Sequence, residues 1–215
     1  MLQKYDIFAY MELLSFPKPP AQFQLAVVRC KDDTSGEISG HFPQRDINAF
    51  SNDRLREHVA VVSAISNLIN HDNWHLEHGK DVGKNGAPEL FENAARSKFS
   101  ISISHCSDAK GATIAAVCLK ETTSKIGVDI VLKADERIPR VAPRTMSERE
   151  LGEGQLERVW AVKESMFKAF GPGMDFKNDL EVTFKKQEVV GKVRGEESQW
   201  WVEEKDGMVV AMGPI

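Results

Sequence analysis

Two carboxylates and a lysine stand in parts of this sequence that are otherwise apolar. Asp129 interrupts the run "IGVDIV", and Glu164 and Lys168 lie on one stretch, "RVWAVKESMFKAF". An ionised carboxylate in an apolar strand is costly unless it lies at the strand end or meets a cation. Hard cations such as Mg²⁺ bind one or two protein carboxylates and complete their shell with phosphate oxygens and water. The pattern favours a divalent ion shared by Asp129 and Glu164; an Asp129 that caps a turn at the strand end is the plainer alternative.

The stretch 158–171 ("RVWAVKESMFKAFG") is predicted to be a helix that carries part of this chemistry. At about 100° per residue, one broad arc of it is apolar: Val159, Val162, Met166, Phe167 and Phe170. Glu164 and Lys168 fall together on another face with Ser165. As an exposed pair of opposite charges they would contribute only about 0.2–0.5 kcal/mol to helix stability. Lys163 falls within the apolar arc, so its stem can be buried while its ammonium group needs a partner.

A histidine follows an alternating strand in "FSISISHCSD", at residues 99–108. His105 at the end of such a strand is well placed to contact an anion, although a loop carbonyl could satisfy it instead. The chain order of a strand-end His105, a strand Asp129 and a helical Glu164 and Lys168 is more informative than any one of these residues. Together they indicate a site for an anionic ligand and a metal ion.

The elements that must position these residues alternate between strands and helices. We expect a helix at 52–70 as well as at 158–171, because both have apolar residues at helical spacing. Strands are predicted at 24–30, 99–108, 112–120 and 125–133, and in the tail segments "DLEVTF", "QEVVGKV" and "QWWVEEKDGMVVAM", with a hairpin turn at 205–207. The segment 79–90 is predicted to be turn-rich, and 134–150 is charged and contains proline. Both halves can be read as a helix followed by strands, which suggests an internal duplication.

Composition limits the classes of function. The 215 residues are 41% hydrophobic, enough for a core in one domain or in two small halves. The net charge of -4 comes from well-mixed acidic and basic residues, which argues against a general nucleic-acid binder. Cys30, Cys106 and Cys118 lack metal-type spacing and are predicted to be free thiols in a reducing compartment. No apolar run approaches membrane-spanning length, so we expect a soluble cytoplasmic protein.

Three further histidines, in "HDNWHLEH", have spacings of four and three residues. On a helix His71, His75 and His78 would share a face and could bind zinc. The Asn and Asp residues among them disfavour a continuous helix, and no fourth ligand is evident. We therefore interpret this segment as a solvated connector.

Several blocks of the sequence resemble the 4'-phosphopantetheinyl transferases, specifically the monomeric Sfp-like type built from two similar halves. That family's signature is Gly-hydrophobic-Asp on a strand and, several dozen residues later, Trp-x-x-Lys-Glu-Ser/Ala-x-x-Lys. Here these blocks are Gly127–Asp129 and Trp160–Lys168. Upstream, "ISISHC" is similar to the family's Ile-Ser-His-Ser segment and "NGAPEL" to its Gly-Lys-Pro turn. Between the two signature blocks, "RIPRVAPRTMSERE" resembles its segment leading to Ser-x-x-Glu. The resemblance covers residues 80–185.

The resemblance implies a reaction and its cofactor. The phosphopantetheine arm of coenzyme A would move to a serine of an acyl or peptidyl carrier protein, with release of 3',5'-ADP. Asp129 and Glu164 would hold Mg²⁺, or Mn²⁺ in its place. Lys168 would face the pyrophosphate of coenzyme A, and Lys163 would support this cluster.

The resemblance also assigns roles in substrate binding. Ser104 and His105 would contact the phosphates of coenzyme A, and Pro88 would belong to the turn beside the nucleotide. Glu150, in the Ser-x-x-Glu position, would orient or deprotonate the incoming serine, a role that Glu164 could take instead.

Three positions depart from the family pattern. Val131 stands where many relatives carry a second acid, and Ala87 replaces the lysine of the turn. The helix at 52–70 lacks the arginine that commonly contacts the 3'-phosphate, a role that Arg54 or Arg56 could fill. These departures favour an alternative to the active enzyme, namely a catalytically impaired relative that binds coenzyme A or a carrier protein.

We therefore predict an α+β fold of two halves related by a pseudo-twofold, each a helix packed on a small antiparallel sheet. The halves would comprise residues 1–124 and residues 125–215, the second carrying the metal and pyrophosphate motif. Coenzyme A would lie between them, the carrier protein would dock beside the second half, and the protein would be a monomer. Neither a nucleic acid nor a membrane is an expected partner.

Overall fold

The first part of the fold is an antiparallel sheet covered on one face by a long helix. The computed structural model describes residues 11–31, 38–78, 86–186 and 188–215. The strands of this sheet follow the order β1 (Met11–Leu14), β2 (Phe23–Cys30), β7 (Thr113–Glu121) and β6 (Phe99–Ser107). The helix α1 (Asn52–Leu68) begins after Ser51, whose side chain accepts a hydrogen bond from the Arg54 amide. Its buried face includes Val59, Ala60 and Ile65.

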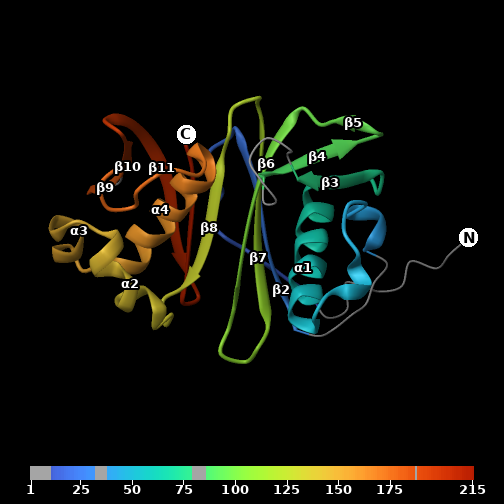
Figure 1. Ribbon diagram of the computed structural model, residues 1–215, viewed down its shortest axis with the longest axis horizontal. Helices are drawn as coiled ribbons and strands as arrows, with labels where there is room; N and C mark the ends of the chain where they lie inside the picture. Colours follow the sequence, from blue (N-terminus) through green and yellow to red (C-terminus); the bar gives the residue numbers. More distant parts are fainter. Residues whose placement is uncertain (1–10, 32–37, 79–85, 187) are drawn as a thin grey trace, which may run out of the picture.

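Shorter elements surround α1 and this first sheet (Figure 1). A separate three-stranded sheet is formed by β3 (Trp74–His78), β4 (Pro88–Glu92) and β5 (Ala95–Arg96). Among the residues described before α1, two segments form single turns of 3₁₀ helix, namely η2 (Ser39–His41) and η3 (Ile47–Ala49).

The second part of the fold is a five-stranded antiparallel sheet with its own helix. Its strand order is β8 (Gly127–Leu132), β12 (Met208–Gly213), β11 (Glu196–Lys205), β10 (Glu188–Val193) and β9 (Leu180–Lys185). The helix α4 (Leu156–Phe170) packs on β8 and β12. Before it come two shorter helices, α2 (Arg137–Thr145) and α3 (Glu148–Gly152).

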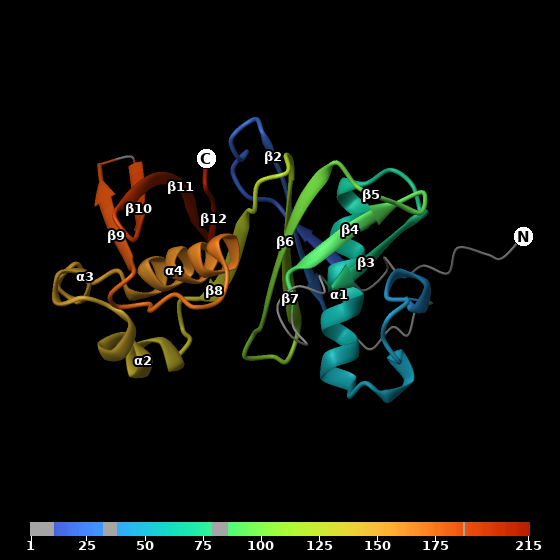
Figure 2. The ribbon, with the colours of Figure 1, turned by 45° about the horizontal axis from the view of Figure 1, so that its top comes forward.

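The same topology occurs in both parts. A strand is followed by a helix and then by a hairpin whose last strand pairs with the first strand, as β2–α1–β6–β7 and as β8–α4–β11–β12. The two sheets pack face to face between α1 and α4 (Figures 1 and 2). A third apolar cluster fills the space between the sheets and includes Val27, Ile114, Val128 and Val210. This architecture confirms the predicted α+β fold.

Most predicted elements are present, and two expectations were wrong. Residues 74–78 are a strand with a buried Trp74 rather than a solvated connector. The charged segment 134–150, to which the sequence assigned no element, contains α2 and the start of α3. Phe170 is 39% exposed and does not belong to the buried arc of α4. In the predicted turn at 79–90, residues 79–85 lie outside the described part of the chain, and 88–90 belong to β4.

The hairpin turn was predicted correctly. It lies between β11 and β12, where Asp206 and Gly207 both have positive φ. Positive φ at both central residues suits the two-residue turns that match the twist of an antiparallel hairpin.

Gly127 allows α4 to approach β8 more closely than any side chain would permit. A Cβ atom built on Gly127 would lie 1.8 Å from the carbonyl oxygen of Ser165, a backbone atom of α4. The first residue of the Gly-Val-Asp block is therefore a packing requirement. It sets the distance between the strand that carries Asp129 and the helix that carries Glu164 and Lys168.

We expect the substitution Gly127→Ala to lower the free energy of unfolding by at least about 1–3 kcal/mol, because the added methyl group meets helix backbone that cannot rotate away. Gly152→Ala is the matched control, since a Cβ atom there meets nothing within 4 Å. Urea denaturation followed by circular dichroism measures both. Equal stabilities of the two variants would contradict the close packing of α4 on β8.

Candidate active site

Asp129 is the centre of a polar cluster between β6, β8 and α4. Its side chain is buried, with the residue only 5% exposed. The Oδ1 atom accepts a hydrogen bond from the Ser104 hydroxyl at 2.7 Å and from the Lys168 ammonium at 2.6 Å. Lys168 also donates to the Val128 carbonyl at 3.0 Å. The structure thus brings together three of the residues predicted from the sequence, and Ser104 contacts Asp129 directly.

The second carboxylate oxygen of Asp129 lacks a protein donor. Among the described residues, Oδ2 is a buried atom without a hydrogen-bond partner. Leaving a buried polar atom unsatisfied costs about 1–3 kcal/mol, and more when the group is charged. Such an atom therefore indicates a ligand that the protein alone does not supply, and a hard cation suits a carboxylate oxygen.

Glu164 lies on α4 one helical turn before Lys168 and is partly buried. Burial and, after it, the negative charge of Asp129 raise the pKa of Glu164 to about 7, while Lys168 acts in the opposite direction. A cation between Asp129 and Glu164 would stabilise the ionised form of Glu164. The donor set of Asp129 and Glu164 therefore fits Mg²⁺ with an incomplete protein shell.

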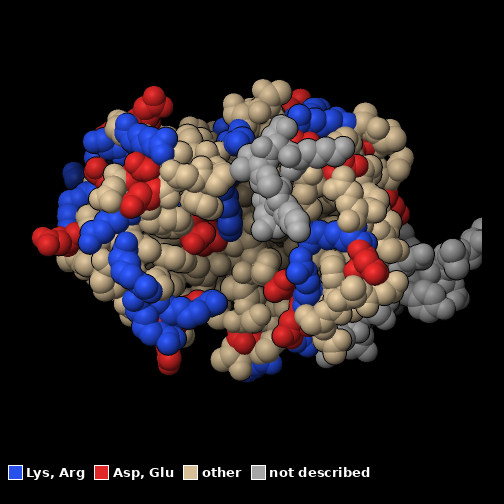
Figure 3. Space-filling view, in the orientation of Figure 1, with Lys and Arg blue, Asp and Glu red and all other residues tan. Residues whose placement is uncertain are grey.

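Two cavities adjoin on the first half of the molecule, and the larger extends to α4. The larger, of about 540 Å³, is lined by Ala87 and by the cations Lys98, Lys125 and Lys168. The smaller, of about 210 Å³, is lined by His105 and by further polar residues of the first half. Pro88 and Ile103 line both. Lys and Arg side chains border the depression between the two halves on this face (Figure 3).

Ser104 and His105 point to opposite sides of β6, as successive residues of a strand must. Ser104 contacts Asp129, whereas the Nδ1 atom of His105 lies 3.5 Å from Glu57 Oε1 on the side of α1. Ser102, which the sequence did not single out, accepts a hydrogen bond from the Val128 amide at 2.9 Å. Ser102 and Ser104, which alternate along β6, therefore bind β8 by hydrogen bonds. His105 lines the smaller cavity.

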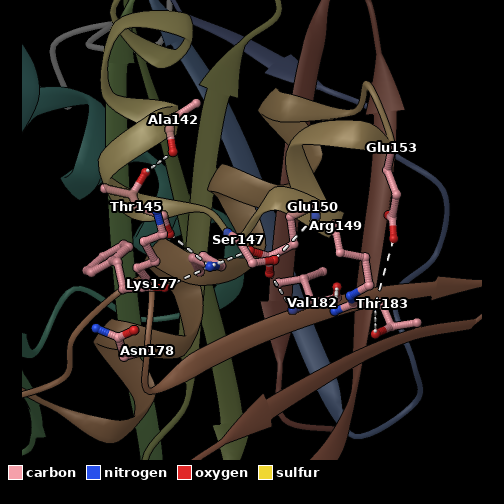
Figure 4. A network of polar contacts seen from close by, with 12 residues as sticks. Ala142, Thr145, Ser147, Arg149, Glu150, Glu153, Lys177, Asn178, Val182 and Thr183 are labelled. Carbon is pink, nitrogen blue, oxygen red and sulfur yellow. Dashed lines mark hydrogen bonds and ion pairs between the residues drawn. The ribbon is translucent and has the colours of Figure 1, made fainter.

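Glu150 and Lys163 form an ion pair in the interior of the second half. Both side chains are 0% exposed, and Lys163 Nζ lies 2.8 Å from Glu150 Oε2. The ammonium also donates to the carbonyls of Thr145 and Phe176 at 2.8 and 2.7 Å. The carboxylate accepts hydrogen bonds from the amides of Ser147 and Val182, both at 2.8 Å. Glu150 lies between Ser147 and Val182, which places it among α3, α4 and β9 (Figure 4).

This placement gives Glu150 and Lys163 a packing role. Each group is saturated with partners, and neither meets solvent from which a serine hydroxyl or a phosphate could approach. Burial lowers the pKa of Lys163, and the hydrogen bond and charge of Glu150 oppose that shift. This enclosure argues against Glu150 as the acceptor of the serine proton and against Lys163 as a ligand of coenzyme A.

The three histidines considered as zinc ligands are separated by their actual structure. His75 and His78 lie on β3 rather than on a helix, and His71 Nε2 is paired with Glu92 at 3.0 Å. Throughout the ranges that the structure describes, no three His, Cys, Asp or Glu side chains gather into a metal-binding group.

Residues 125–211 match the family model of the 4'-phosphopantetheinyl transferase superfamily. This segment contains β8, α4 and the cluster around Asp129, and the match supports transfer of a phosphopantetheinyl group as the general activity. No curated protein matches the chain. In the described residues there is no helix with the length and hydropathy required to cross a membrane.

The structure shows what surrounds two of the positions that depart from the pattern of the phosphopantetheinyl transferases. Val131 is buried in the apolar cluster that contains α4, on the same face of β8 as Asp129. An acid at this position would be surrounded by apolar side chains in this chain. Ala87 lines the larger cavity, so the lysine it replaces would have added a charge there.

We expect Lys163→Met to cost about 3–5 kcal/mol of stability, because it leaves the Glu150 carboxylate buried without its cation. The double variant Lys163→Met with Glu150→Gln should recover part of this loss, since no charge is then buried. Lys177→Met is the control, because Lys177 is exposed. Chemical denaturation measures all three. A loss below about 1 kcal/mol for Lys163→Met, the value of an exposed pair, would contradict the buried ion pair.

His58 is expected to make stability depend on pH. Burial lowers the pKa of His58 to about 4 from its ordinary 6.5; a hydrogen bond to the Arg54 carbonyl opposes this shift, and the charge of Arg45 adds to it. As the pH falls, the unfolded chain therefore binds a proton on His58 before the folded protein does. The contribution of His58 to stability is complete only above about pH 6.5. Its contribution should decline as the pH falls towards 4. Urea midpoints at pH 5 and pH 7 should differ less in His58→Gln, and an unchanged difference would contradict the shift.

Proposed function

We propose that this chain is an active Mg²⁺-dependent transferase that moves the 4'-phosphopantetheine arm of coenzyme A to a serine of an acyl or peptidyl carrier protein. The other product is 3',5'-ADP. The observation that carries the proposal is the buried Asp129, whose Oδ1 is held by Ser104 and Lys168 while its Oδ2 has no donor among the described residues. A carboxylate fixed in this way suits a metal ligand better than a structural ion pair.

Asp129 and Glu164 are the proposed ligands of Mg²⁺, and Mn²⁺ has the oxygen preference to replace it. When bound, the ion supplies neutralisation of the charge on the pyrophosphate during displacement at phosphorus. Two protein carboxylates are enough, because Mg²⁺ usually completes its coordination shell with phosphate oxygens and water. Ser104 orients Asp129 by its hydrogen bond at 2.7 Å.

Lys168 is the proposed cation of this chain for binding the substrate. It lines the larger cavity and reaches Asp129 from α4. We propose that the pyrophosphate of coenzyme A lies beside Lys168, in the cleft formed by the two adjoining cavities, with Pro88 and His105 on its walls. Because Glu150 is enclosed, Glu164 is the remaining carboxylate of the proposed site for the proton of the serine hydroxyl.

The proposal extends to the organisation of the protein. It keeps the division into residues 1–124 and 125–215, a monomeric state, a cytoplasmic location, and docking of the carrier protein beside the second half. The alternative is a relative that binds coenzyme A or a carrier protein without transfer. The apolar surroundings of Val131 and the small side chain of Ala87 are the observations that favour it.

Intact-mass spectrometry distinguishes the two functions. Several apo carrier proteins are incubated with this protein, coenzyme A and Mg²⁺, with a chelator in the control. We expect a mass gain of one phosphopantetheine that disappears with the chelator. The absence of a gain in every carrier, together with coenzyme A binding in calorimetry, would replace the transferase with the binding module.

The variants Asp129→Asn and Glu164→Gln test the metal ligands in the same assay. Each retains size and hydrogen-bonding groups while removing the charge, so we expect at least about a hundredfold loss of transfer with an unchanged circular dichroism spectrum. Glu197→Gln, an identical change at an exposed residue of β11, should leave transfer unchanged. Undiminished transfer in either of the first two variants would refute the metal assignment.

A further inference from the structure

The strand β8 presents an open edge to the first half of the molecule. It stands at one end of its sheet, with β12 as its neighbour, and β6 likewise stands at one end of the first sheet. In the described part of the chain, no backbone ladder joins β6 to β8. The open edge of a strand carries amide and carbonyl groups that need partners from elsewhere. Beside Asp129, side chains supply these partners.

Val128 is the residue whose backbone is held in this way. Its amide donates to Ser102 Oγ at 2.9 Å, and its carbonyl accepts from Lys168 Nζ at 3.0 Å. The next residue is Asp129, whose Oδ1 accepts hydrogen bonds from Ser104 and from the same ammonium group. Ser102 and Ser104 are two residues apart on β6 and therefore point to the same face of it. Two hydroxyls and one lysine thus hold two successive residues of β8.

The two serines act on different parts of β8. Ser104 binds the carboxylate itself, whereas Ser102 binds only the backbone of the preceding residue. Val128 is 0% exposed and Ser102 is 4% exposed, so the hydrogen bond between them is shielded from solvent. An amide that is buried without an acceptor is costly, and a strand relieves this cost by moving towards another acceptor. Such a movement would displace Asp129, because it is the next residue.

We propose that Ser102 is a positioning residue for the metal ligand Asp129. It fixes the backbone from which the carboxylate projects, so that Oδ2 keeps one position before a ligand arrives. Preorganisation of this kind reduces the cost of ordering a site on binding. Ser102 acts through Asp129 and does not itself bind the ion. The inference rests on the proposed function, because it takes Asp129 to be a ligand of Mg²⁺.

A purely structural role is the alternative, and Ser100 provides the comparison. Ser100 lies two residues before Ser102 on β6, and its hydroxyl donates to the Thr122 carbonyl at 2.9 Å. Both serines line the larger cavity, and each binds one backbone group. Only Ser102 binds the strand that carries Asp129. Removal of either hydroxyl therefore loses one hydrogen bond, but only the loss at Ser102 should reach the metal ligand.

Titration of Mn²⁺, followed by the electron paramagnetic resonance of the free ion, tests the proposal without any reaction. The ion is added to the protein alone and in the presence of coenzyme A. We expect Ser102→Ala to weaken Mn²⁺ binding roughly tenfold, as is typical when an outer partner of a metal ligand is removed. Ser100→Ala should stay within about twofold of the wild type, because it changes no partner of a metal ligand. Asp129→Asn should lose Mn²⁺ binding.

The Mg²⁺ dependence of transfer gives a second readout. With Ser102→Ala we expect half-maximal transfer at about tenfold more Mg²⁺ and a maximal rate within about threefold of the wild type, because saturation with the ion restores the position of the ligand. A purely structural loss would lower the maximal rate with the folded fraction and leave the Mg²⁺ requirement unchanged. Ser102→Cys retains the size but offers only a weak acceptor, so it should lie between the wild type and Ser102→Ala.

The outcomes separate this inference from the proposed function. If Ser102→Ala binds Mn²⁺ as tightly as Ser100→Ala does, the positioning role is wrong even when transfer occurs. If Ser102→Ala binds Mn²⁺ more weakly although no carrier is modified, the positioning role stands and the transferase does not. If the wild type binds no Mn²⁺ with or without coenzyme A, both the metal site and this inference are refuted. Circular dichroism melting shows whether each variant is folded, and Ser102→Cys decides the comparison if Ser102→Ala is not.

Discussion

The close packing of α4 against β8 is the constraint on which the rest of the site depends. Gly127 permits it, because the backbone of Ser165 occupies the space that a side chain would need. At this separation Lys168 reaches two successive residues of the strand, the Val128 carbonyl and the Asp129 carboxylate. A larger distance would leave Asp129 buried without a cation, which is far more costly than an exposed carboxylate. The motif glycine and the motif acid therefore form one structural unit.

The two lysines of α4 illustrate how one motif serves two purposes. Lys168 lies at the edge of the helix, where it borders the larger cavity. Lys163 points into the second half and binds Glu150 and two carbonyl groups, so α2, α3 and α4 are tied together around one buried charge. Burying such a pair costs desolvation of both ions, and an apolar pair would often be as stable. We infer that the pair is retained because it specifies one orientation of α4.

The sequence predicted the elements and the main residues of the site, but not the contacts between distant segments. Helical and alternating periodicity identified α1, α4 and most strands, and the unusual Asp129 in an apolar run identified the cluster. Charge alone could not separate Glu150, which is enclosed, from Glu164, which is not. That difference arises from tertiary packing. The strand β3 was missed because it is short and follows a run of Asn and Asp residues. Its burial depends on its pairing with β4 and on η2, whose His41 stacks on Trp74.

Arg45 shows most clearly why residue type and spacing are insufficient. In the sequence it is one arginine in a polar segment, outside every block of the family signature. Its surroundings come from His58 and His78, which lie 13 and 33 residues away and whose ring nitrogens contact its guanidinium group. Asp129 Oδ2 is the opposite case, a buried anionic atom without a donor among the described residues. Folded proteins satisfy nearly all of their buried polar groups, so such exceptions need an explanation. An unsatisfied carboxylate oxygen beside Lys168 is such an exception, and a hard cation is the kind of ligand that would satisfy it.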